Sequence, residues 1–222
     1  VFHLASLFLS EHSPDDLENL VASNILFGTQ LVEAMTLNGC RKLVNTGTSW
    51  QHYEDRDYNP VNLYAATKQA FEDILEYYVQ ARKLGVITLK LYDTYGPGDK
   101  RKKIMPVLLD KFLKDEPIHL TGGDNLLDLV YIDDVCSAFS AAAERMNGGS
   151  ILSHERFAVR SGKPVSLRQL VEIFSRTGGK DVRAEWGSFP YRDREVMTPW
   201  KGGLSLPGWN PSVSLEEGIR RF

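Results

Sequence analysis

A tyrosine and a lysine four residues apart are the pair of side chains in this sequence best suited to proton transfer. Tyr64 and Lys68 fall in a segment whose apolar spacing predicts a long helix, so positions i and i+4 share one face. A lysine ammonium beside a phenol stabilises the phenolate, which lets the tyrosine exchange a proton near neutral pH. Alone this spacing is common, and a surface tyrosine beside a solvated lysine is the alternative interpretation.

A polar turn upstream of the helix supplies hydroxyl groups. The apolar pair Leu43-Val44 predicts a strand, which breaks within Thr46-Gly47-Thr48-Ser49. A hydroxyl at the carboxyl end of a strand, followed by the tyrosine helix, can hydrogen-bond the substrate oxygen that the tyrosine protonates. In isolation these residues indicate an ordinary polar turn, whereas their place before Tyr64 favours a role in catalysis.

The elements that must position these residues alternate between strands and helices. The predicted strands are almost uniformly apolar and are separated by helical stretches, a pattern typical of parallel βαβ units covered on both faces. The expected strands are 1–5, 42–48, 86–91, 118–120, 129–132 and 157–159, and the expected helices are 14–38, 106–114, 133–146 and 167–178, with a long helix that follows the turn at 59–60 and ends near residue 84. We therefore predict an α/β fold.

Composition excludes several classes of protein. The chain has 222 residues, of which 42% are hydrophobic and 25% charged, as in globular proteins of one large or two small domains. A formal net charge of −3 disfavours nucleic-acid binding, and no apolar run approaches the roughly 20 residues of a membrane span. Cys40, Cys136 and the histidines show no disulfide or metal-ligand pattern, so we expect no metal and a cytoplasmic location.

Six motifs follow one another in an order found in a known enzyme family. They are Val1-Phe2-His3-Leu4-Ala5-Ser6, Asn24-x-x-x-Gly28-Thr29, Thr46-Gly47-Thr48-Ser49, Tyr64-x-x-x-Lys68, Tyr95-Gly96-Pro97-Gly98 and Asp128-Leu129-Val130-Tyr131-Ile132-Asp133-Asp134-Val135. In this the chain resembles, over essentially its whole length, the extended short-chain dehydrogenases/reductases. That family comprises the NAD(P)-dependent epimerases, dehydratases and ketoreductases of nucleotide sugars.

The resemblance implies a fold and a division of the chain. We expect a Rossmann-like doubly wound parallel sheet, lacking the N-terminal part with its Gly-rich loop, and a smaller C-terminal α/β substrate lobe. Residues 1–92 and 126–150 are assigned to the partial dinucleotide-binding domain, and residues 93–125 and 151–222 to the interleaved lobe. Because the chain then starts at the fourth strand of the family, it should bind the dinucleotide pyrophosphate poorly on its own.

The resemblance also implies catalytic roles. Tyr64 is expected to be the acid/base, and Lys68 to hold the nicotinamide ribose and tune Tyr64. Thr48 is the expected hydroxyl partner, with Ser49 as the alternative.

A further group of residues is expected to surround the cofactor. Ala5, Ser6 and Thr46 should line NAD or NADP together with Lys68, beyond the carboxyl ends of the strands. The residue that selects between the two dinucleotides lies in the part of the family pattern that this chain lacks, so that choice stays open. Asn24 is expected on the helix behind the site, where a purely structural contact is the alternative.

The residues after Thr48 distinguish the subfamilies. Dehydratases that resemble this chain carry carboxylates there, because eliminating water needs additional acid/base groups, whereas this chain has Ser49-Trp50-Gln51. Reduction or epimerisation at C4 of the sugar remains. Together with Asp93, where most of the family has asparagine, this segment resembles most the CDP-abequose synthase type. Those enzymes reduce the C4 ketone of a CDP-4-keto-3,6-dideoxyhexose for O-antigen building blocks.

The substrate and partner residues are less clearly marked. Asp93 and Ser49 are expected to face the sugar nucleotide, and Leu127 occupies the position of a family arginine that binds diphosphate. Arg192 or Arg194 could replace that arginine, or could form a surface charge pair instead. The resemblance implies a homodimer through the helices of Asn24 and Tyr64. A non-catalytic sugar-nucleotide-binding relative is the alternative from another class.

Overall fold

Two units make up the chain in the computed structural model, which describes residues 1–149 and 151–222. Each unit is assembled from segments that are far apart in the sequence. The first consists of Val1–Leu91, Ser137–Val159 and Trp200–Trp209, and the second of Tyr92–Cys136, Arg160–Pro199 and Asn210–Phe222.

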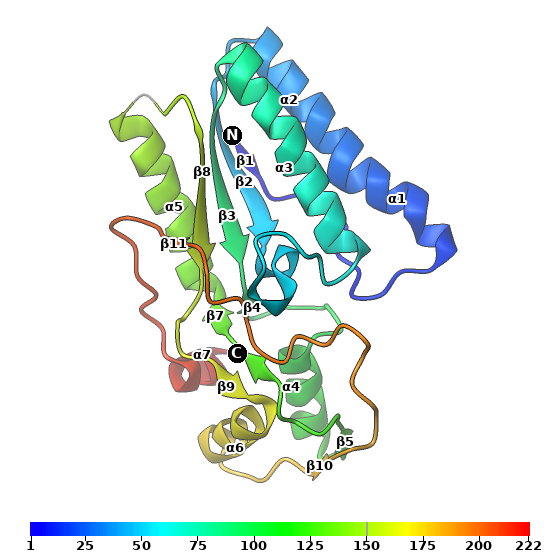
Figure 1. The fold of residues 1–222 in the computed structure, drawn as a ribbon. Helices are drawn as coiled ribbons and strands as arrows, with labels where there is room; N and C mark the ends of the chain where they lie inside the picture. The colour runs from blue at the N-terminus through cyan, green and yellow to red at the C-terminus, as the bar shows by residue number, and fades with distance from the viewer. Residues whose placement is uncertain (150) are drawn as a thin grey trace. The chain divides into compact units, whose positions relative to one another are not determined.

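A five-stranded sheet organises the first unit, with all neighbouring strands parallel (Figure 1). Its order is β1-β2-β3-β8-β11, where β1 is Phe2–His3, β2 Lys42–Thr48, β3 Gly85–Leu91, β8 His154–Val159 and β11 Leu204–Ser205. Nearly every residue of β2 and β3 is buried, as expected for central parallel strands. The predicted Rossmann-like parallel sheet with flanking helices is confirmed.

Helices cover one face of this sheet as two long rods (Figure 1). The first rod runs through α1 (Leu17–Val21), a π-helical turn (Ala22–Leu26) and α2 (Phe27–Leu37). The second is α3 (Leu63–Arg82), which Asn62 caps at its start and which ends where Lys83 adopts a left-handed conformation with φ 57°. An apolar cluster between the rods and the sheet includes Val32, Leu43, Phe71, Leu75 and Val86.

The opposite face of the sheet is covered by α5 (Ile132–Gly148). Successive side chains of a strand point to opposite faces, so Phe2 points away from the face where His3 meets Phe71 of α3. The ring of Phe2 packs edge-on against Phe139 of α5, with centroids 6.1 Å apart. The indole of Trp209 donates to Ser137 Oγ at 2.8 Å, which ties the segment after β11 to α5.

The second unit combines small sheets with helices around its own core. Its parallel pairs are β4 (Asp93–Tyr95) with β7 (Leu129–Tyr131) and β5 (Ile118–His119) with β10 (Ala184–Glu185); β6 (Leu126–Leu127) and β9 (Val165–Ser166) are antiparallel. Its helices are α4 (Ile104–Lys114), α6 (Leu167–Gly178) and α7 (Leu215–Arg221). Tyr95, Leu108, Leu170 and Phe174 lie at the centre of the core.

The division into units differs from the predicted one. The segment 126–136 lies in the second unit, whereas β8 and β11, assigned to the lobe from sequence, pair in the main sheet. The strand predicted at 157–159 is the second half of β8; its first half carries His154 and Arg156, whose polar character hid the start of a strand that pairs with β3 over six residues. The predicted boundary at residue 150 falls on the residue outside the described part of the chain.

The rod formed by α1 and α2 bears on the predicted absence of a membrane span. By length and composition, Pro14–Leu37 is apolar enough to cross a membrane, although its polar residues interrupt every continuous apolar run. A single helix of this kind near the N-terminus is weak evidence, because core helices and signal sequences meet the same criterion.

Candidate active site

The segment after β1 is held against the start of α3 by two asparagines. Asn62 Oδ1 accepts from Ala65 N at 3.0 Å, while its Nδ2 donates to the carbonyls of Leu9 and Ser10. Asn24, which lies in the π-helical turn, accepts from Leu7 N at 2.8 Å and donates to Leu7 O at 3.0 Å. Both asparagines therefore fix the backbone just beyond the predicted cofactor residues.

Asn24 is also joined directly to the tyrosine helix. Its Nδ2 donates to Thr67 Oγ1 at 3.0 Å, and Thr67 in turn donates to the carbonyl of Tyr64 at 2.7 Å. Asn24 is 1% exposed, so these bonds form in the interior. A π-helical turn displaces residues from regular helical positions and is frequent at functional sites. The role of Asn24 behind the site stays a prediction.

Tyr64 and Lys68 share one buried face of α3. The Lys68 Nζ atom lies 6.0 Å from the centroid of the Tyr64 ring. Phe8, from the segment after β1, packs edge-on against Tyr64 with centroids 5.0 Å apart, and its other neighbour is Trp50 at 5.7 Å. The aromatic contacts thus bring the turn after β2, the segment after β1 and the start of α3 together.

Lys68 has an electrostatic setting that differs from that of a surface lysine. Burial lowers the pKa of Lys68 to about 8, while the charge of Glu72 acts in the opposite direction. Lys68 Nζ donates no hydrogen bond within the described residues. A buried ammonium with unused donors and a pKa close to neutral fits an acceptor such as a ribose hydroxyl, so this end of the site suits the dinucleotide that the family uses.

The predicted hydroxyl residues have different environments. Thr48 ends β2 and begins a short 3-10 turn, Ser49–Gln51, where its Oγ1 accepts from Trp50 N at 3.3 Å. Thr46 Oγ1 donates to the carbonyl of His3 at 2.9 Å and so joins β2 to β1. Ser49 is partly exposed beside Thr48. The Thr46 hydroxyl is committed to the backbone, whereas the Thr48 hydroxyl accepts from backbone N–H groups of the turn and its proton is left available.

Ala5 and Ser6 lie directly beyond the carboxyl end of β1 and are exposed. That is the edge of an open parallel sheet where ligands bind. Their predicted role beside the cofactor stays a prediction.

A buried ion pair beneath the site was not foreseen from the sequence. Lys90 Nζ forms a salt bridge with Glu72 Oε1 at 2.8 Å, and both side chains are almost completely buried. Glu72 Oε1 also accepts from Gln51 Nε2 at 2.9 Å, and Glu72 Oε2 accepts from Arg156 Nε at 3.2 Å. Burial raises the pKa of Glu72, but Lys90 and Gln51 lower it by more, and the net direction is downward. A lysine inside a buried strand and a glutamate one turn after Lys68 were the available signals.

A line of polar side chains crosses the same face of the sheet. His3 Nδ1 lies 2.9 Å from Asn45 Oδ1, Asn45 Nδ2 donates to Thr88 Oγ1 at 3.2 Å, and Thr88 Oγ1 lies 2.7 Å from His154 Nε2. His154 Nδ1 continues to Glu76 Oε1 at 2.9 Å. Burial, with help from Arg156, lowers the pKa of His154 to about 4. The line therefore joins β1, β2, β3 and β8 through neutral imidazoles.

Three of the predicted substrate residues, Asp93, Arg192 and Arg194, belong to the second unit, whereas Ser49 belongs to the first. Asp93 Oδ1 pairs with Lys103 Nζ at 3.2 Å, and Arg192 pairs with Glu195 at 3.0 Å. Arg194 is likewise engaged. Leu127 packs against the apolar core, so the position of the family arginine has become part of that core.

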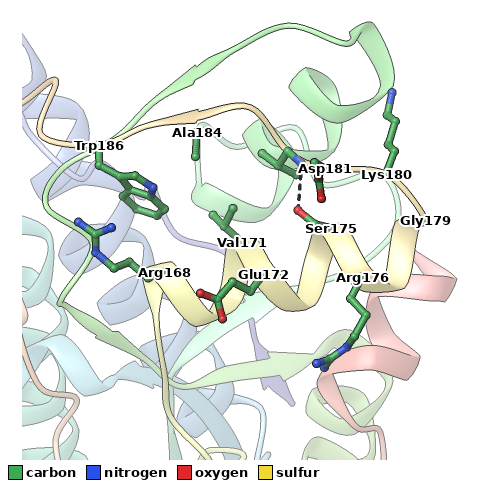
Figure 2. A pocket seen from close by; sticks show the side chains of 11 residues that line it. Arg168, Val171, Glu172, Ser175, Arg176, Gly179, Lys180, Asp181, Ala184 and Trp186 are labelled. Atoms are coloured by element: carbon green, nitrogen blue, oxygen red, sulfur yellow. Dashed lines mark hydrogen bonds between the residues drawn. The ribbon is translucent and has the colours of Figure 1, made fainter.

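An open groove lies along α6 in the second unit (Figure 2). Arg168 stacks on Trp186 with its guanidinium 4.5 Å from the ring centroid, and Arg176 lies 3.5 Å from Glu216. None of the predicted site residues lines this groove. Within residues 1–149 and 151–222, no three His, Cys, Asp or Glu side chains are grouped to hold a metal ion.

Comparison with known proteins defines the class of this chain. The model of the NAD dependent epimerase/dehydratase family matches residues 1–153, and the chain belongs to that family. It is accordingly an enzyme of the extended short-chain dehydrogenase type.

Individual relatives cover the whole chain. CDP-abequose synthase of Salmonella muenchen is 28% identical over 226 residues, which is 100% of this chain and 75% of that protein. UDP-glucuronate 4-epimerase of Thermodesulfobacterium geofontis (strain OPF15) is 29% identical over 234 residues, 100% of this chain and 70% of that protein. The structure of Thermus thermophilus UDP-glucose 4-epimerase in complex with NAD has a TM-score of 0.82 at 26% identity, covering 99% of this chain and 75% of that one.

Proposed function

We propose that this protein reduces the C4 ketone of a nucleotide-activated sugar, a CDP-4-keto-3,6-dideoxyhexose, in cytoplasmic deoxysugar synthesis for O-antigen. The observation that carries the proposal is the buried Tyr64–Lys68 pair, with Lys68 Nζ 6.0 Å from the Tyr64 ring and a pKa of Lys68 of about 8. The similarity to CDP-abequose synthase over the full chain supports the substrate class.

The side chains divide the work of the reduction. Bound NADH or NADPH supplies the hydride that is added to C4. Tyr64 donates its phenolic proton to the C4 oxygen, so that the ketone becomes an alcohol and the phenolate remains. Lys68 stabilises that phenolate and donates to the nicotinamide ribose, while the Thr48 hydroxyl donates to the C4 oxygen and orients the ketone. Ala5, Ser6 and the backbone around Thr46 line the dinucleotide.

The turn after Thr48 supports reduction over dehydration. Ser49, Trp50 and Gln51 offer no carboxylate to remove a proton at C5, whereas reduction needs only the proton of Tyr64. Epimerisation at C4 uses the same residues twice, and the similarity to UDP-glucuronate 4-epimerase makes it the second candidate. A non-catalytic sugar-nucleotide-binding relative is the third.

The remaining substrate contacts are assigned residue by residue. Asp93, with Lys103 beside it, is assigned to the sugar nucleotide, and so is Ser49 beside Thr48. Arg192 or Arg194 replaces the family arginine as the diphosphate ligand, since Leu127 lies in the core. The Arg192–Glu195 pair is exposed enough at the arginine to open for a phosphate.

A homodimer completes the proposed assembly. The rod formed by α1 and α2 exposes Leu17, Val21, Leu26 and Phe27, each by 45% or more. An apolar helix face of this kind is covered in most stable proteins, and a second copy of the same rod would cover it by symmetry.

The decisive assay follows nicotinamide absorbance in the purified protein given CDP-4-keto-3,6-dideoxyglucose, first with NADPH and then with NADH. Stoichiometric loss of the reduced cofactor is the expected result, and the rate with each dinucleotide identifies the coenzyme. No net loss, but a nucleotide hexose inverted at C4, would make the protein an epimerase. Neither reaction would favour the binding protein.

A further inference from the structure

The orientation of Thr48 is set by a side chain three residues further on. The backbone N–H of Thr48 donates to Gln51 Oε1 at 3.0 Å, while Thr48 Oγ1 accepts from Trp50 N at 3.3 Å. The two bonds form a reciprocal cap on the 3-10 turn Ser49–Gln51. The rotamer of Thr48 therefore depends on Gln51 remaining where it is.

Gln51 is in turn fixed by the tyrosine helix. Its Nε2 donates to Gln69 Oε1 at 2.7 Å and to Glu72 Oε1 at 2.9 Å, and Gln51 itself is 0% exposed. Both acceptors lie on α3, within about one turn of Lys68. The carboxamide oxygen of Gln51 accepts from the Thr48 backbone, while its nitrogen donates to α3. A flip of this carboxamide would therefore break buried hydrogen bonds on both sides.

The Glu72 carboxylate that receives Gln51 is anchored in the sheet. Lys90 of β3 reaches it across Gly47 of β2, where a Cβ would lie 2.9 Å from Lys90 Cδ and 3.0 Å from Glu72 Oε1. Gly47 is thus required because a larger side chain would clash with the Glu72–Lys90 ion pair, and not because the backbone turns there. Strand β2, strand β3 and helix α3 meet at this one carboxylate.

We propose that Gln51, held by Glu72, is a positioning residue that places the Thr48 hydroxyl against the substrate oxygen at a fixed distance from Tyr64. Because Trp50 N occupies a lone pair of Thr48 Oγ1, the hydroxyl proton is left to donate to the ligand. The inference rests on the proposed function, since it assigns Gln51 a part in the same reaction. The turn Ser49–Gln51 is then a mechanical link between the hydroxyl and the helix that carries the acid.

The test replaces Gln51 by methionine, which keeps the volume of the side chain and removes both hydrogen-bonding groups. We expect kcat to fall about 10-fold or more, because displacement of a reacting group by about 1 Å costs up to ~100-fold. The KM for the nucleotide sugar and the Kd for the dinucleotide should change less than about two-fold. Gln51→Asn has a side chain too short to bond both Thr48 N and α3, so its kcat should fall as in Gln51→Met. This second variant guards against a folding defect caused by methionine alone. Glu76→Gln, one turn beyond Glu72, is the matched control and should leave kcat unchanged.

A double-mutant cycle separates positioning from general damage. The Thr48→Ala variant has no hydroxyl to position, so adding Gln51→Met to it should lower kcat by less than about two-fold further. Equal losses in the wild-type and Thr48→Ala backgrounds would overturn the proposal, as would an unchanged kcat in Gln51→Met.

Amide hydrogen exchange at Thr48 tests the link without any substrate. We expect about 10-fold faster exchange at this amide in Gln51→Met, with unchanged rates in the apolar part of α3. An unchanged rate at Thr48 would refute the link itself. Absence of turnover in the wild-type protein would instead remove the proposed function, so the two failures have different signatures.

Discussion

Helix α3 meets the sheet through two zones of opposite character. Along one stripe of α3, Phe71, Leu75 and Val79 pack on Leu43 and Val86 in a cluster without charges. The neighbouring stripe carries Lys68 and Glu72, and the same face of the sheet contributes further polar side chains; all of these groups are buried: His3, Asn45, Lys68, Glu72, Thr88 and Lys90. One helix thus has an apolar stripe and a polar stripe that carries its chemistry.

The difference between the zones separates stability from orientation. Each apolar side chain of the first zone stabilises the fold by leaving water, with little dependence on direction. The polar zone gains less, because burying an ion pair such as Glu72–Lys90 costs desolvation that the attraction hardly offsets. Its directional bonds instead fix where Thr48, Tyr64 and Lys68 lie. The catalytic end of the sheet is therefore expected to be the less stable and the more tightly oriented end.

The largest expected effect comes from the tyrosine at the end of the polar zone. Tyr64→Phe removes one hydroxyl and keeps the ring contact with Phe8, so the fold should be retained. We expect turnover to fall by about 10²–10⁴-fold, the usual contribution of a general acid. Rates of cofactor oxidation and a thermal melt, measured on one preparation, check both statements. Retained activity would remove Tyr64 from the mechanism.

The next effect compares the two zones directly. Glu72→Leu leaves Lys90 charged, buried and unpaired, and should destabilise the protein by about 3–5 kcal/mol. Leu75→Ala, in the apolar zone, should cost a similar amount of about 2–5 kcal/mol through the cavity that it creates. Denaturant unfolding gives both values.

The two losses should respond differently to a second substitution. Lys90→Met removes the orphaned charge and should restore most of the stability of Glu72→Leu, while Leu75→Ala should gain nothing from it. If Lys90→Met repairs neither variant, the polar zone is not held by this ion pair. That outcome would place its stability in the line from His3 to His154 instead.

The sequence predicted these zones unequally. The apolar zone follows from periodicity, because Phe71, Leu75 and Val79 recur at helical spacing and the strands beside them are continuously apolar. The polar zone depends on pairs such as Glu72 with Lys90 and Gln51 with Thr48, which only tertiary packing brings together. Tyr64, Lys68 and Thr48 could be found because a motif marks them. Gln51, three residues from Thr48, could be singled out from the sequence only because dehydratases carry carboxylates in that segment and this chain does not.

β8 was misassigned for a related physical reason. A strand that carries His154 and Arg156 on one face lacks the apolar run expected of a central parallel strand. Those residues can be buried or half-buried because glutamates of α3 hydrogen-bond them: Glu76 contacts His154, and Glu72 accepts from Arg156. Partners supplied by another element cannot be deduced from the strand itself.

Replacing Lys68 is expected to have a smaller effect on stability, and one of opposite sign to those of Glu72→Leu and Leu75→Ala. Burial lowers its folded-state pKa to about 8 from 10.5, and each unit corresponds to about 1.4 kcal/mol, so its charge costs up to about 3 kcal/mol at pH 7. Lys68→Met should therefore raise the free energy of unfolding by about 1–3 kcal/mol while abolishing activity. Between pH 8 and 10.5 the unfolded chain binds more protons than the folded one, so the wild type gains stability as the pH rises.

The pH dependence provides the control for this prediction. The advantage of Lys68→Met should shrink steadily from about pH 8 upwards, and urea unfolding at about pH 7 and about pH 10 measures it. A constant difference between variant and wild type would mean that lost packing or hydrogen bonding, and not the buried charge, sets the stability at this position.

The smallest expected effect lies where the polar zone meets the segment after β1. Asn62→Ala removes the cap of α3 and should cost about 1–2 kcal/mol in the free energy of unfolding. Asn62→Asp keeps an acceptor for Ala65 N but loses the donors to Leu9 and Ser10, so it should cost less than Asn62→Ala. Both variants free the chain beyond Ala5 and Ser6, and both should weaken dinucleotide binding by a similar factor in calorimetry. Weaker binding in Asn62→Ala alone would tie the cofactor segment to helix stability rather than to the clamp that Asn62 forms.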